Sequence, residues 1–294
     1  RTTHRYKSRT PNALHLREER KAWTAGDPIP RQYVLASDGL PARNQGAWAR
    51  DKLRFLHEYE GPALGATRKK RGHTHYVDLF AGPGLNVSVS DGVTQEFPGS
   101  PIFALYAGFK GRGWSGRFGA YHYCNLSPLD YQLLDDRIQK KIHEIGDPTL
   151  TGKVSHRLGD ANNLVVEVME SVPTFAYVLA FADIEGPGDL AFETLQEIKR
   201  RHKSVDLYVL YPTGMGMDRL LAYDPKKRKR HRATLDRYFG TGAWWDLVEE
   251  RKTDRDGPAL RQSLKELYLS QLRGLWKNAR VVLSVRKHGQ LKLY

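Results

Sequence analysis

The stretch HYVDLFAGPG, residues 75–84, decides the fold class of this sequence. A run of apolar and aromatic residues of strand length ends in an acid, an aromatic residue and the two glycines Gly82 and Gly84. A buried strand that opens into a glycine-containing turn is typical of the first unit of an α/β sheet. Ligands of such sheets bind just beyond the carboxyl ends of the strands, so this turn is also the first candidate binding site.

More strand-length segments follow and alternate with helical patterns. Strands are expected at 75–80, 118–124, 153–158, 176–183 and 206–211, and helices at 100–109, 128–145, 161–171 and 189–202. Apolar runs that alternate with helices indicate parallel strands covered on both faces. We therefore expect a doubly wound, mostly parallel sheet of five strands.

The region before this alternation has a different character. Residues 1–46 are basic and interrupted by prolines and glycines, which predicts an irregular amino-terminal arm before a single α/β domain over 47–294. A helix is expected over 48–59, ending at Gly61-Pro62, and a charged linker over 67–72. The residues at helical spacing are Trp48, Lys52, Phe55, Leu56 and Tyr59.

The carboxyl-terminal part is mostly helical by pattern. Residues 214–278 show helical spacing, interrupted by a basic insertion near 224–233, and 279–287 begins a strand-like end. We expect a carboxyl-terminal antiparallel hairpin that is cut short at Tyr294. Because the sequence begins with Arg1 rather than Met, we expect it to be part of a longer reading frame.

The glycine loop favours one class of ligand. It departs from the dinucleotide pattern G-x-G-x-x-G, because Phe80 stands at the first glycine and no third glycine follows at the required spacing. An acid, an aromatic residue and two glycines suit an adenosyl group with an amino-acid tail, as in S-adenosylmethionine. The alternative is a tight strand-to-helix turn that is glycine-rich by chance. The candidate loop residues are Asp78, Phe80, Ala81, Gly82, Pro83 and Gly84.

Three later positions bear on that ligand. Asn125 ends the second strand, where an acid usually bonds the ribose hydroxyls, and it can bond one hydroxyl less strongly. Asp160 and Ala161 follow the third strand and could meet the adenine amino group, although Asp160 could equally cap the next helix. Asp183 and Glu185 follow the fourth strand and place two carboxylates at the same end of the sheet.

Taken together, the ordered motifs resemble one family. WARDKLRFLHEY (48–59), YVDLFAGPG (76–84), FPGSPIFALYA (97–107), GDANNLV (159–165), ADIEGPG (182–188) and YPTGMGMDRL (211–220) resemble the three-Cys-motif partner proteins, as does SDGLPARNQGAW (37–48). The resemblance implies a Rossmann-like class I methyltransferase fold with S-adenosylmethionine as cofactor. It also implies a partner protein with three cysteines of the radical-enzyme type, which this chain, with its lone Cys124, cannot itself be.

The resemblance assigns roles to matching positions. Asp78, Phe80, Gly82 and Gly84 resemble the cofactor loop, Asp160 the adenine contact, and Asp183 the acid of a D-P-aromatic-G turn. Two departures stand out in the sequence. Asn125 replaces the usual acid, and Ile184 and Glu185 replace the proline and the aromatic residue of that turn.

The reaction type follows from which nucleophiles are present. A cytosine-5 methyltransferase needs a cysteine after the fourth strand, where this chain has Ile184 and Glu185, so that mechanism is rejected. Transfer to an amine or hydroxyl needs only an aligned acceptor and a group that accepts its hydrogen. Asp183 is the first choice for that group, and Glu185 the second. None of the eleven histidines shows metal-ligand spacing, so no metal site is expected, and His73 and His75 are expected at the surface.

The charge of the chain points to its partner. The net charge of +14 favours a polyanion such as nucleic acid. Three basic runs occur, RKKR (68–71), KRRHK (199–203) and KKRKRHR (226–232), and any of them could be a solvated face. The third is the candidate nucleic-acid contact, with Lys226, Lys227, Arg228, Lys229, Arg230 and Arg232. A different class of function also fits: a nucleic-acid-binding or assembly module whose methyltransferase site is degenerate.

Cysteine content and hydropathy indicate the compartment. One cysteine excludes a disulfide framework, a thiolate zinc site and a cysteine-ligated iron–sulfur cluster within the chain. No apolar run approaches the roughly 18 residues that span a bilayer, and residues 1–20 lack the apolar stretch of a signal peptide. We expect a soluble cytoplasmic protein.

Overall fold

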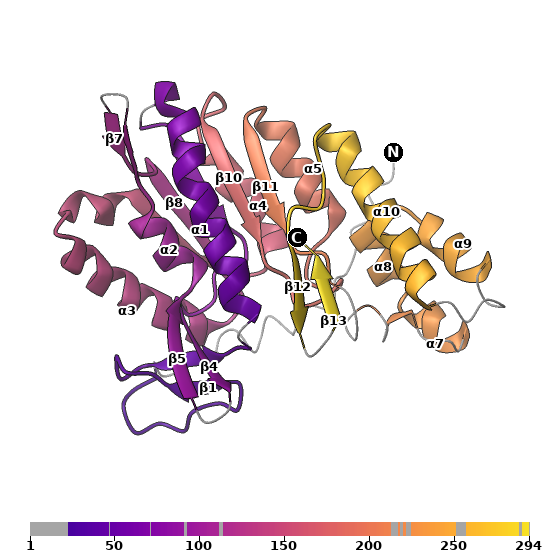
Figure 1. The fold of residues 1–294 in the computed structure, drawn as a ribbon, viewed down its shortest axis with the longest axis horizontal. Helices are drawn as coiled ribbons and strands as arrows, with labels where there is room; N and C mark the ends of the chain where they lie inside the picture. Colours follow the sequence, from indigo (N-terminus) through magenta and orange to yellow (C-terminus); the bar gives the residue numbers. More distant parts are fainter. Residues whose placement is uncertain are drawn as a thin grey trace.

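The computed structural model describes residues 23–46, 48–70, 72–90, 93–111, 114–212, 217, 220–221, 225–250, 257–287 and 290–293. Its centre is a parallel sheet of five strands in the order β11-β10-β3-β8-β9 (Figure 1). The strands are β3 (Thr74–Asp78), β8 (Ala120–Asn125), β9 (Val154–Leu158), β10 (Tyr177–Ala182) and β11 (Val205–Val209). The predicted five-stranded parallel sheet is confirmed, and its architecture is consistent with a Rossmann-like α/β fold.

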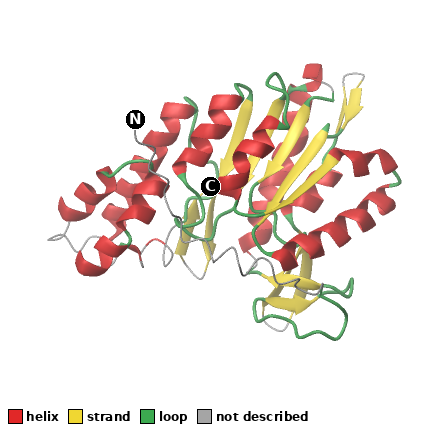
Figure 2. Ribbon diagram, turned by 180° about the vertical axis from the view of Figure 1, so that it is seen from behind, coloured by secondary structure: helices red, strands yellow, loops and turns green. Residues whose placement is uncertain are grey.

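The middle strands are buried because both faces of the sheet are covered. Every residue of β3 and β10 is buried. In Figure 1, helix α1 (Trp48–Ala66) crosses the front of the sheet, and α4 (Ala161–Glu170) and α5 (Phe192–Arg201) lie behind it. Figure 2 shows the same layers from the opposite side. Helices on both faces remove the alternation of polar and apolar residues from the strands between them.

Local signals fix the ends of the long helix α3 (Pro128–Ile145). The hydroxyl of Ser127 accepts a hydrogen bond from the Asp130 amide, and Pro128 occupies the first turn. Gly146 ends the helix with φ of 72°, a left-handed conformation that favours glycine. The prediction of a helix over 128–145 is confirmed.

Helix α1 does not break where the sequence pattern predicts. It continues through Pro62 to Ala66, and only then does a short 3₁₀ turn, η1 (Arg68–Lys70), replace the expected linker. Pro62 removes one backbone donor near the end of the helix. Ala63 and Leu64 beyond it are buried in the main core, and that burial offsets the lost hydrogen bond.

A second, smaller sheet was not predicted. It contains β1 (Tyr33–Leu35), β2 (Pro41–Asn44), β4 (Leu85–Ser90) and β5 (Val93–Pro98), in the order β1-β2-β4-β5. The prediction of an irregular arm over 1–46 is therefore wrong for the residues of β1 and β2, and residues 1–22 lie outside the described residues. The sheet packs on a small cluster of its own, formed by Ala36, Ala42 and Val87. Figure 1 shows it at the lower left, at the carboxyl edge of the central sheet.

The hairpin β4–β5 is an insertion between the glycine loop and α2 (Ser100–Tyr106). The Gly99 amide donates to the carbonyl oxygen of Gly84 at 2.8 Å, so the chain leaves the loop and returns to it. The expected turn from strand to helix is thus completed by two residues that are fifteen positions apart in sequence.

The carboxyl-terminal part corrects the prediction for the basic run. Residues Pro225–Arg230 form helix α7, so this run is not a loop, and α8 (Arg232–Phe239), α9 (Ala243–Glu250) and α10 (Gly257–Leu275) follow. Strands β12 (Ser284–Lys287) and β13 (Gln290–Leu293) pair antiparallel and form a separate two-stranded sheet. In the described part of the chain, no helix is long and apolar enough to cross a membrane.

Candidate functional site

The candidate site residues converge at the carboxyl edge of the central sheet. Asp78 ends β3, Asn125 ends β8, Asp160 follows β9, and Asp183 follows β10. Parallel strands place these ends at one edge. Since β3 lies between β8 and β10, the connections leave it in opposite directions, and the topological switch point is beside Asp78 and Asp183.

Asp78 is fully buried at the start of the glycine loop. Its Oδ1 accepts from the Phe80 amide at 3.1 Å, and its Oδ2 lies 3.4 Å from the Tyr76 hydroxyl. Burial raises the pKa of Asp78 to about 7, and the nearby charge of Asp183 adds to that rise. Asp78 therefore organises the loop from beneath and does not itself reach solvent.

The loop backbone is held by its neighbours up to Ala81. The Leu79 amide donates to Phe181 of β10, and the Ala81 amide donates to Cys124 of β8. Cys124 is buried, and burial raises the pKa of its thiol to about 12. The amides of Leu79, Phe80 and Ala81 therefore make internal hydrogen bonds and are not available to a bound molecule.

The two glycines of the loop have different surroundings. Both have positive φ, 62° at Gly82 and 82° at Gly84. A Cβ on Gly84 would lie 2.9 Å from Leu134, so that glycine is required for packing. A Cβ on Gly82 would meet nothing within 4 Å. Gly82 is thus the position at which a bound molecule could approach the backbone closely.

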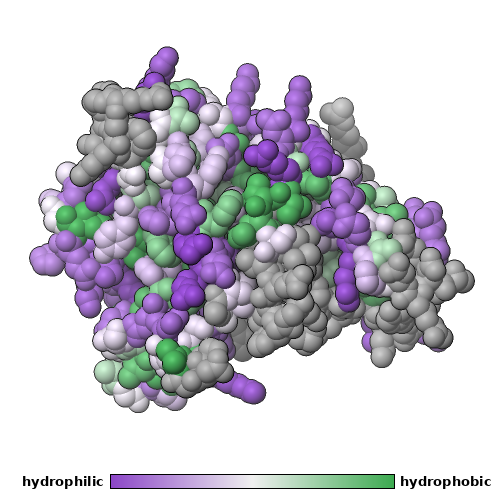
Figure 3. All heavy atoms as spheres, in the orientation of Figure 1, coloured by the Kyte–Doolittle hydropathy of each residue, from purple (hydrophilic) through white to green (hydrophobic). Residues whose placement is uncertain are grey.

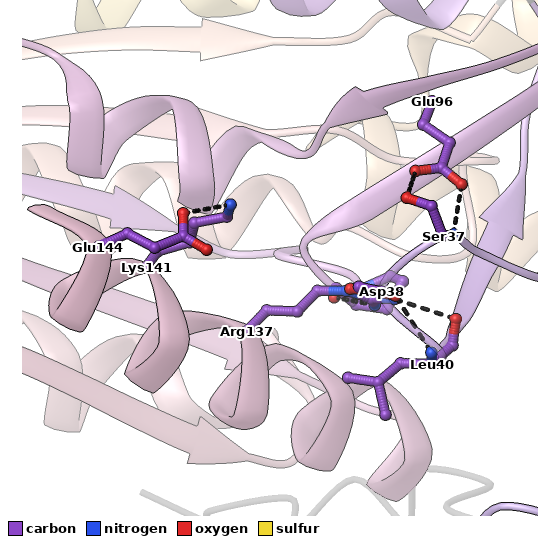
Figure 4. A network of polar contacts seen from close by, with 8 residues as sticks. Ser37, Asp38, Leu40, Glu96, Arg137, Lys141 and Glu144 are labelled. Carbon is purple, nitrogen blue, oxygen red and sulfur yellow. Dashed lines mark hydrogen bonds and ion pairs between the residues drawn. The ribbon is translucent and has the colours of Figure 1, made fainter.

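Arg137 of α3 joins the turn between β1 and β2 to the glycine loop, and Figure 4 shows its side chain beside Asp38 and Leu40 of that turn. Its guanidinium donates to the Pro83 carbonyl at 2.8 Å, to both oxygens of Asp38, and to the Leu40 carbonyl. Arg137 is buried, and its hydrogen bonds and charge lower the pKa of Asp38, although desolvation of Asp38 opposes them. The turn between β1 and β2 is thereby fixed to the glycine loop.

Asn125 and Asp160 both make internal bonds. The Asn125 side-chain amide donates to the Gly82 carbonyl at 3.1 Å and lies 3.1 Å from Nε2 of His156. Asp160 Oδ1 accepts from the Asn162 amide at 2.9 Å, which is the helix-cap alternative for this residue, and Ala161 is the first residue of α4. Asn125 therefore reaches the glycine loop, whereas Asp160 stabilises the start of α4.

Asp183 is paired with a residue that the sequence did not single out. The ammonium of Lys52 on α1 contacts Asp183 Oδ2, and it lies 5.1 Å from the centre of the Trp48 ring. The Lys52 side chain is 4% exposed and that of Asp183 is 25% exposed. The sequence contains a sign of this pair. Lys52 lies at helical spacing with Trp48, Phe55, Leu56 and Tyr59, on a face that is otherwise aromatic and aliphatic.

Glu185 lies farther out. Its side chain is 80% exposed, and it pairs with Arg43 at 3.0 Å. Arg43 also binds the buried Asp130 at 2.7 Å, and Asp130 accepts from the Tyr33 hydroxyl. Through these contacts, the small sheet is joined to the turn after β10. Of the two carboxylates proposed for the reaction, Asp183 is closer to the switch point.

Helix α7, which carries the basic run, is followed by α8, and α8 lies beside the turn after β10. Lys226, Lys229 and Arg230 are exposed, and so is Arg232, whose guanidinium lies 5.0 Å from the centre of the Trp245 ring. A Cβ on Gly188, in the turn after β10, would lie 3.8 Å from Thr234 of α8. The side chains of Lys227 and Arg228 lie outside the described residues. Trp244 is fully buried.

The histidines at the opposite edge correct another prediction. His75 is buried, with its Nδ1 3.0 Å from Nε2 of His122, and the two rings are stacked. Burial lowers the pKa of His75 to about 4 and that of His122 to about 3. The prediction of two surface histidines is confirmed for His73 and wrong for His75.

A cavity of about 380 Å³ lies away from the candidate site, between α1, β11, α10 and the segment that follows α10. Its walls are mostly aromatic and aliphatic, with Phe55, Tyr208, Tyr268 and Trp276 among them. No candidate site residue from the sequence lines it.

Comparisons with known proteins are sparse. No protein-family model matches the sequence, and no curated protein matches it. Among solved structures, one match is a crystal structure of protein LPL1258 from Legionella pneumophila str. Philadelphia 1, described with the family DUF519. The two share 13% identity, the match covers 60% of this chain and 70% of that chain, and the TM-score is 0.36. A likeness of that size carries no argument about function.

Proposed function

We propose that this chain is an S-adenosylmethionine-dependent methyltransferase of the Rossmann-like class I type, acting on an amine or hydroxyl of a nucleic acid. The observation that carries the proposal is Gly82. It lies at the switch point of a parallel sheet, in a loop that an acid anchors from below, and a Cβ there would meet nothing within 4 Å. As the family resemblance implies, we propose that it works with a three-cysteine partner protein of the radical-enzyme type.

The donor groups at this edge fit the cofactor in part. The backbone at Gly82, in the loop that Asp78 anchors from below, would hold its amino-acid tail, and Oδ2 of Asp160 would face the adenine amino group beside Ala161. Asn125 already donates to Gly82, so its remaining oxygen would accept from one ribose hydroxyl. When bound, the cofactor would supply an electrophilic methyl group.

Asp183 would orient the methyl acceptor by accepting a hydrogen bond from its N–H or O–H group. The ammonium of Lys52 pairs with the Asp183 carboxylate and fixes its direction. The proton that the acceptor loses on methylation would pass to this carboxylate and then to solvent. Glu185, which is exposed and paired with Arg43, would contact the acceptor from the solvent side.

The proposed substrate class rests on charge. A net charge of +14 needs a polyanionic partner, and α7 presents lysine and arginine side chains to solvent. Thr234 of the adjoining α8 lies beside Gly188, in the turn that carries Asp183 and Glu185. Phosphates held by α7 would therefore bring a nucleic acid to the turn that carries both carboxylates.

A second candidate is a nucleic-acid-binding or assembly module with a degenerate site. The internal hydrogen bonds of Asn125 and Asp160 and the ion pair of Asp183 favour it, because each occupies a group that a methyltransferase would use. Methyl transfer from labelled cofactor to total RNA, DNA and protein separates the two. The enzyme proposal expects transfer to nucleic acid that is lost in Asp183→Asn, while cofactor binding is retained.

The control for that assay is Asp135→Asn, an exposed aspartate on α3. It removes the same charge away from the switch point and is expected to leave transfer unchanged. No transfer to any of the three pools by the wild type would favour the module. Transfer that survives in Asp183→Asn would show that the proposed acceptor contact is wrong.

A further inference from the structure

The opposite edge of the central sheet, where the strands begin, is also basic. Lys69 and Lys70 lie in the 3₁₀ turn η1 before β3, Arg200 lies in the last turn of α5, and Lys203 lies in the loop between α5 and β11. The described residues of the two segments 67–73 and 199–204 include no acidic side chain. In Figure 3 this edge of the molecule is at the top, and hydrophilic side chains project from it. Arg200 is neutralised by Glu197, whereas Lys69 and Lys203 are exposed.

An aromatic ring is presented to solvent at the same edge. Phe175, in the loop before β10, is 60% exposed. The ammonium of Lys70 donates to its carbonyl oxygen at 2.8 Å, and the Ala176 amide donates to the Pro173 carbonyl, so the loop backbone is fixed. The ring of His73 meets Phe175 edge-on, with the centroids 4.7 Å apart. Phe175 is thus held outward on a fixed loop.

The strand order places these loops next to one another. Strand β10 pairs with β3 on one side and with β11 on the other. Phe175, just before β10, therefore lies between the basic segments 67–73 and 199–204. The Val178 amide bonds the Ser204 carbonyl, and the Tyr177 amide bonds the His73 carbonyl. An exposed aromatic ring flanked by cations is the arrangement that holds single-stranded nucleic acid, because every base has a face that can stack.

We propose that this edge is a second nucleic-acid-binding surface, specific for single strands. A base stacks on Phe175, and Lys69 and Lys203 contact the phosphates on its two sides. A duplex offers no unstacked base to the ring, so single strands bind more tightly. This surface lies at the edge opposite the candidate methyltransferase site, and its binding does not require the cofactor.

The test is fluorescence anisotropy with a labelled oligouridylate, the matching oligothymidylate, and a duplex of the same length. The starting protein carries glutamine at the five basic positions 226–230, which removes the contribution of α7. Phe175→Ala is expected to weaken single-strand binding about tenfold with an unchanged salt dependence, and Phe175→Trp to retain it. Lys69→Gln with Lys203→Gln is expected to reduce the salt slope by about 1.4, for two phosphates on a single strand.

The control is Lys140→Gln, an exposed lysine on α3, which should change neither quantity. The proposal is overturned if the starting protein does not bind single strands, or if Phe175→Ala and Phe175→Trp bind alike. It is also overturned if the duplex binds as tightly as the single strand, or if polyglutamate displaces the oligonucleotide at equal charge, since charge alone would then explain the binding. None of these results depends on cofactor binding.

Discussion

Lys52 of α1 and Asp183 after β10 form an ion pair at the switch point of the central sheet, 131 positions apart in sequence. It joins the first helix to the turn that carries both candidate carboxylates. Trp48, one turn earlier on the same helix, covers the ammonium with its ring. The pair therefore fixes the direction of the Asp183 carboxylate, and it keeps the positive charge of Lys52 compensated in a buried position.

Removing either partner of this ion pair should destabilise the fold, and the two losses should differ in size. Asp183→Asn leaves the buried Lys52 charge uncompensated and is expected to lower the free energy of unfolding by about 3 kcal/mol. Lys52→Met leaves the charge of the partly exposed Asp183 unpaired and is expected to lower it by about 1.5 kcal/mol. The double variant should lose less than the sum of the two. Urea unfolding of all four proteins measures the coupling. Strict additivity would mean that the pair contributes nothing to stability.

Asp78 should make the protein less stable as pH rises. Burial raises its pKa to about 7 in the fold, against roughly 4 in the unfolded chain, so the folded state binds the extra proton in this window. The contribution is fully present below pH 4 and is lost as pH rises to 7, on the order of 3 kcal/mol. Asp78→Asn should remove this loss, so its stability relative to the wild type should increase between pH 5 and pH 8. An equal pH dependence in both proteins would contradict the assignment.

The buried histidines His75 and His122 should act in the opposite direction. Desolvation lowers their pKa values to about 4 and about 3, and the charges of His202, His73 and Arg157 add to this effect. Their contribution is full above the unfolded value of roughly 6.5 and is lost as pH falls towards 4, on the order of 2 kcal/mol per histidine.

Because the effect of Asp78 falls in the same window, the histidine contribution is visible as a difference between variants. The double variant His75→Gln with His122→Gln should lose less stability than the wild type between pH 7 and pH 4.5, as measured by urea unfolding. His143→Gln, at an exposed position on α3, is the control. If the double variant loses as much as the wild type, the buried pair does not carry the acid sensitivity.

Neutralising α7 should weaken nucleic-acid binding without melting the helix. Glutamine at Lys226, Lys227, Arg228, Lys229 and Arg230 retains helix propensity and removes the phosphate contacts. Affinity for RNA and DNA should fall broadly across sequences, and the salt dependence should flatten. Circular dichroism checks the helix content, and anisotropy titrations at several salt concentrations check the binding. Unchanged affinity would make α7 a solvated face.

The central sheet could be predicted from the sequence because strands buried on both faces are continuous apolar runs. Tyr177–Ala182 has no charged side chain, and the neighbouring helices begin and end at capping residues such as Ser127 and Gly146. The small sheet could not be predicted. Its strands are short, and β5 exposes four of its six residues, so neither an apolar run nor a clear alternation marks it.

The candidate site was predictable to the extent that it follows strand ends. Asp78, Asn125 and Asp183 were found because parallel topology brings strand ends together. Lys52, Arg43 and Arg137 come from other elements, and their roles depend on contacts between residues distant in sequence. The helix at Pro225–Arg230 was missed because a basic run has no apolar face, so no period marks it.

Cofactor binding to the wild type tests the central claim most directly. Calorimetry with S-adenosylmethionine and with its demethylated product should show binding that Gly82→Val abolishes, because the new side chain occupies the space where the ligand meets the loop. Gly146→Val is the matched control: Gly146 has φ of 72° and nothing within 4 Å of its Cβ position, so the backbone strain is similar and binding should persist. Wild-type protein that binds neither compound at millimolar concentration would contradict the account.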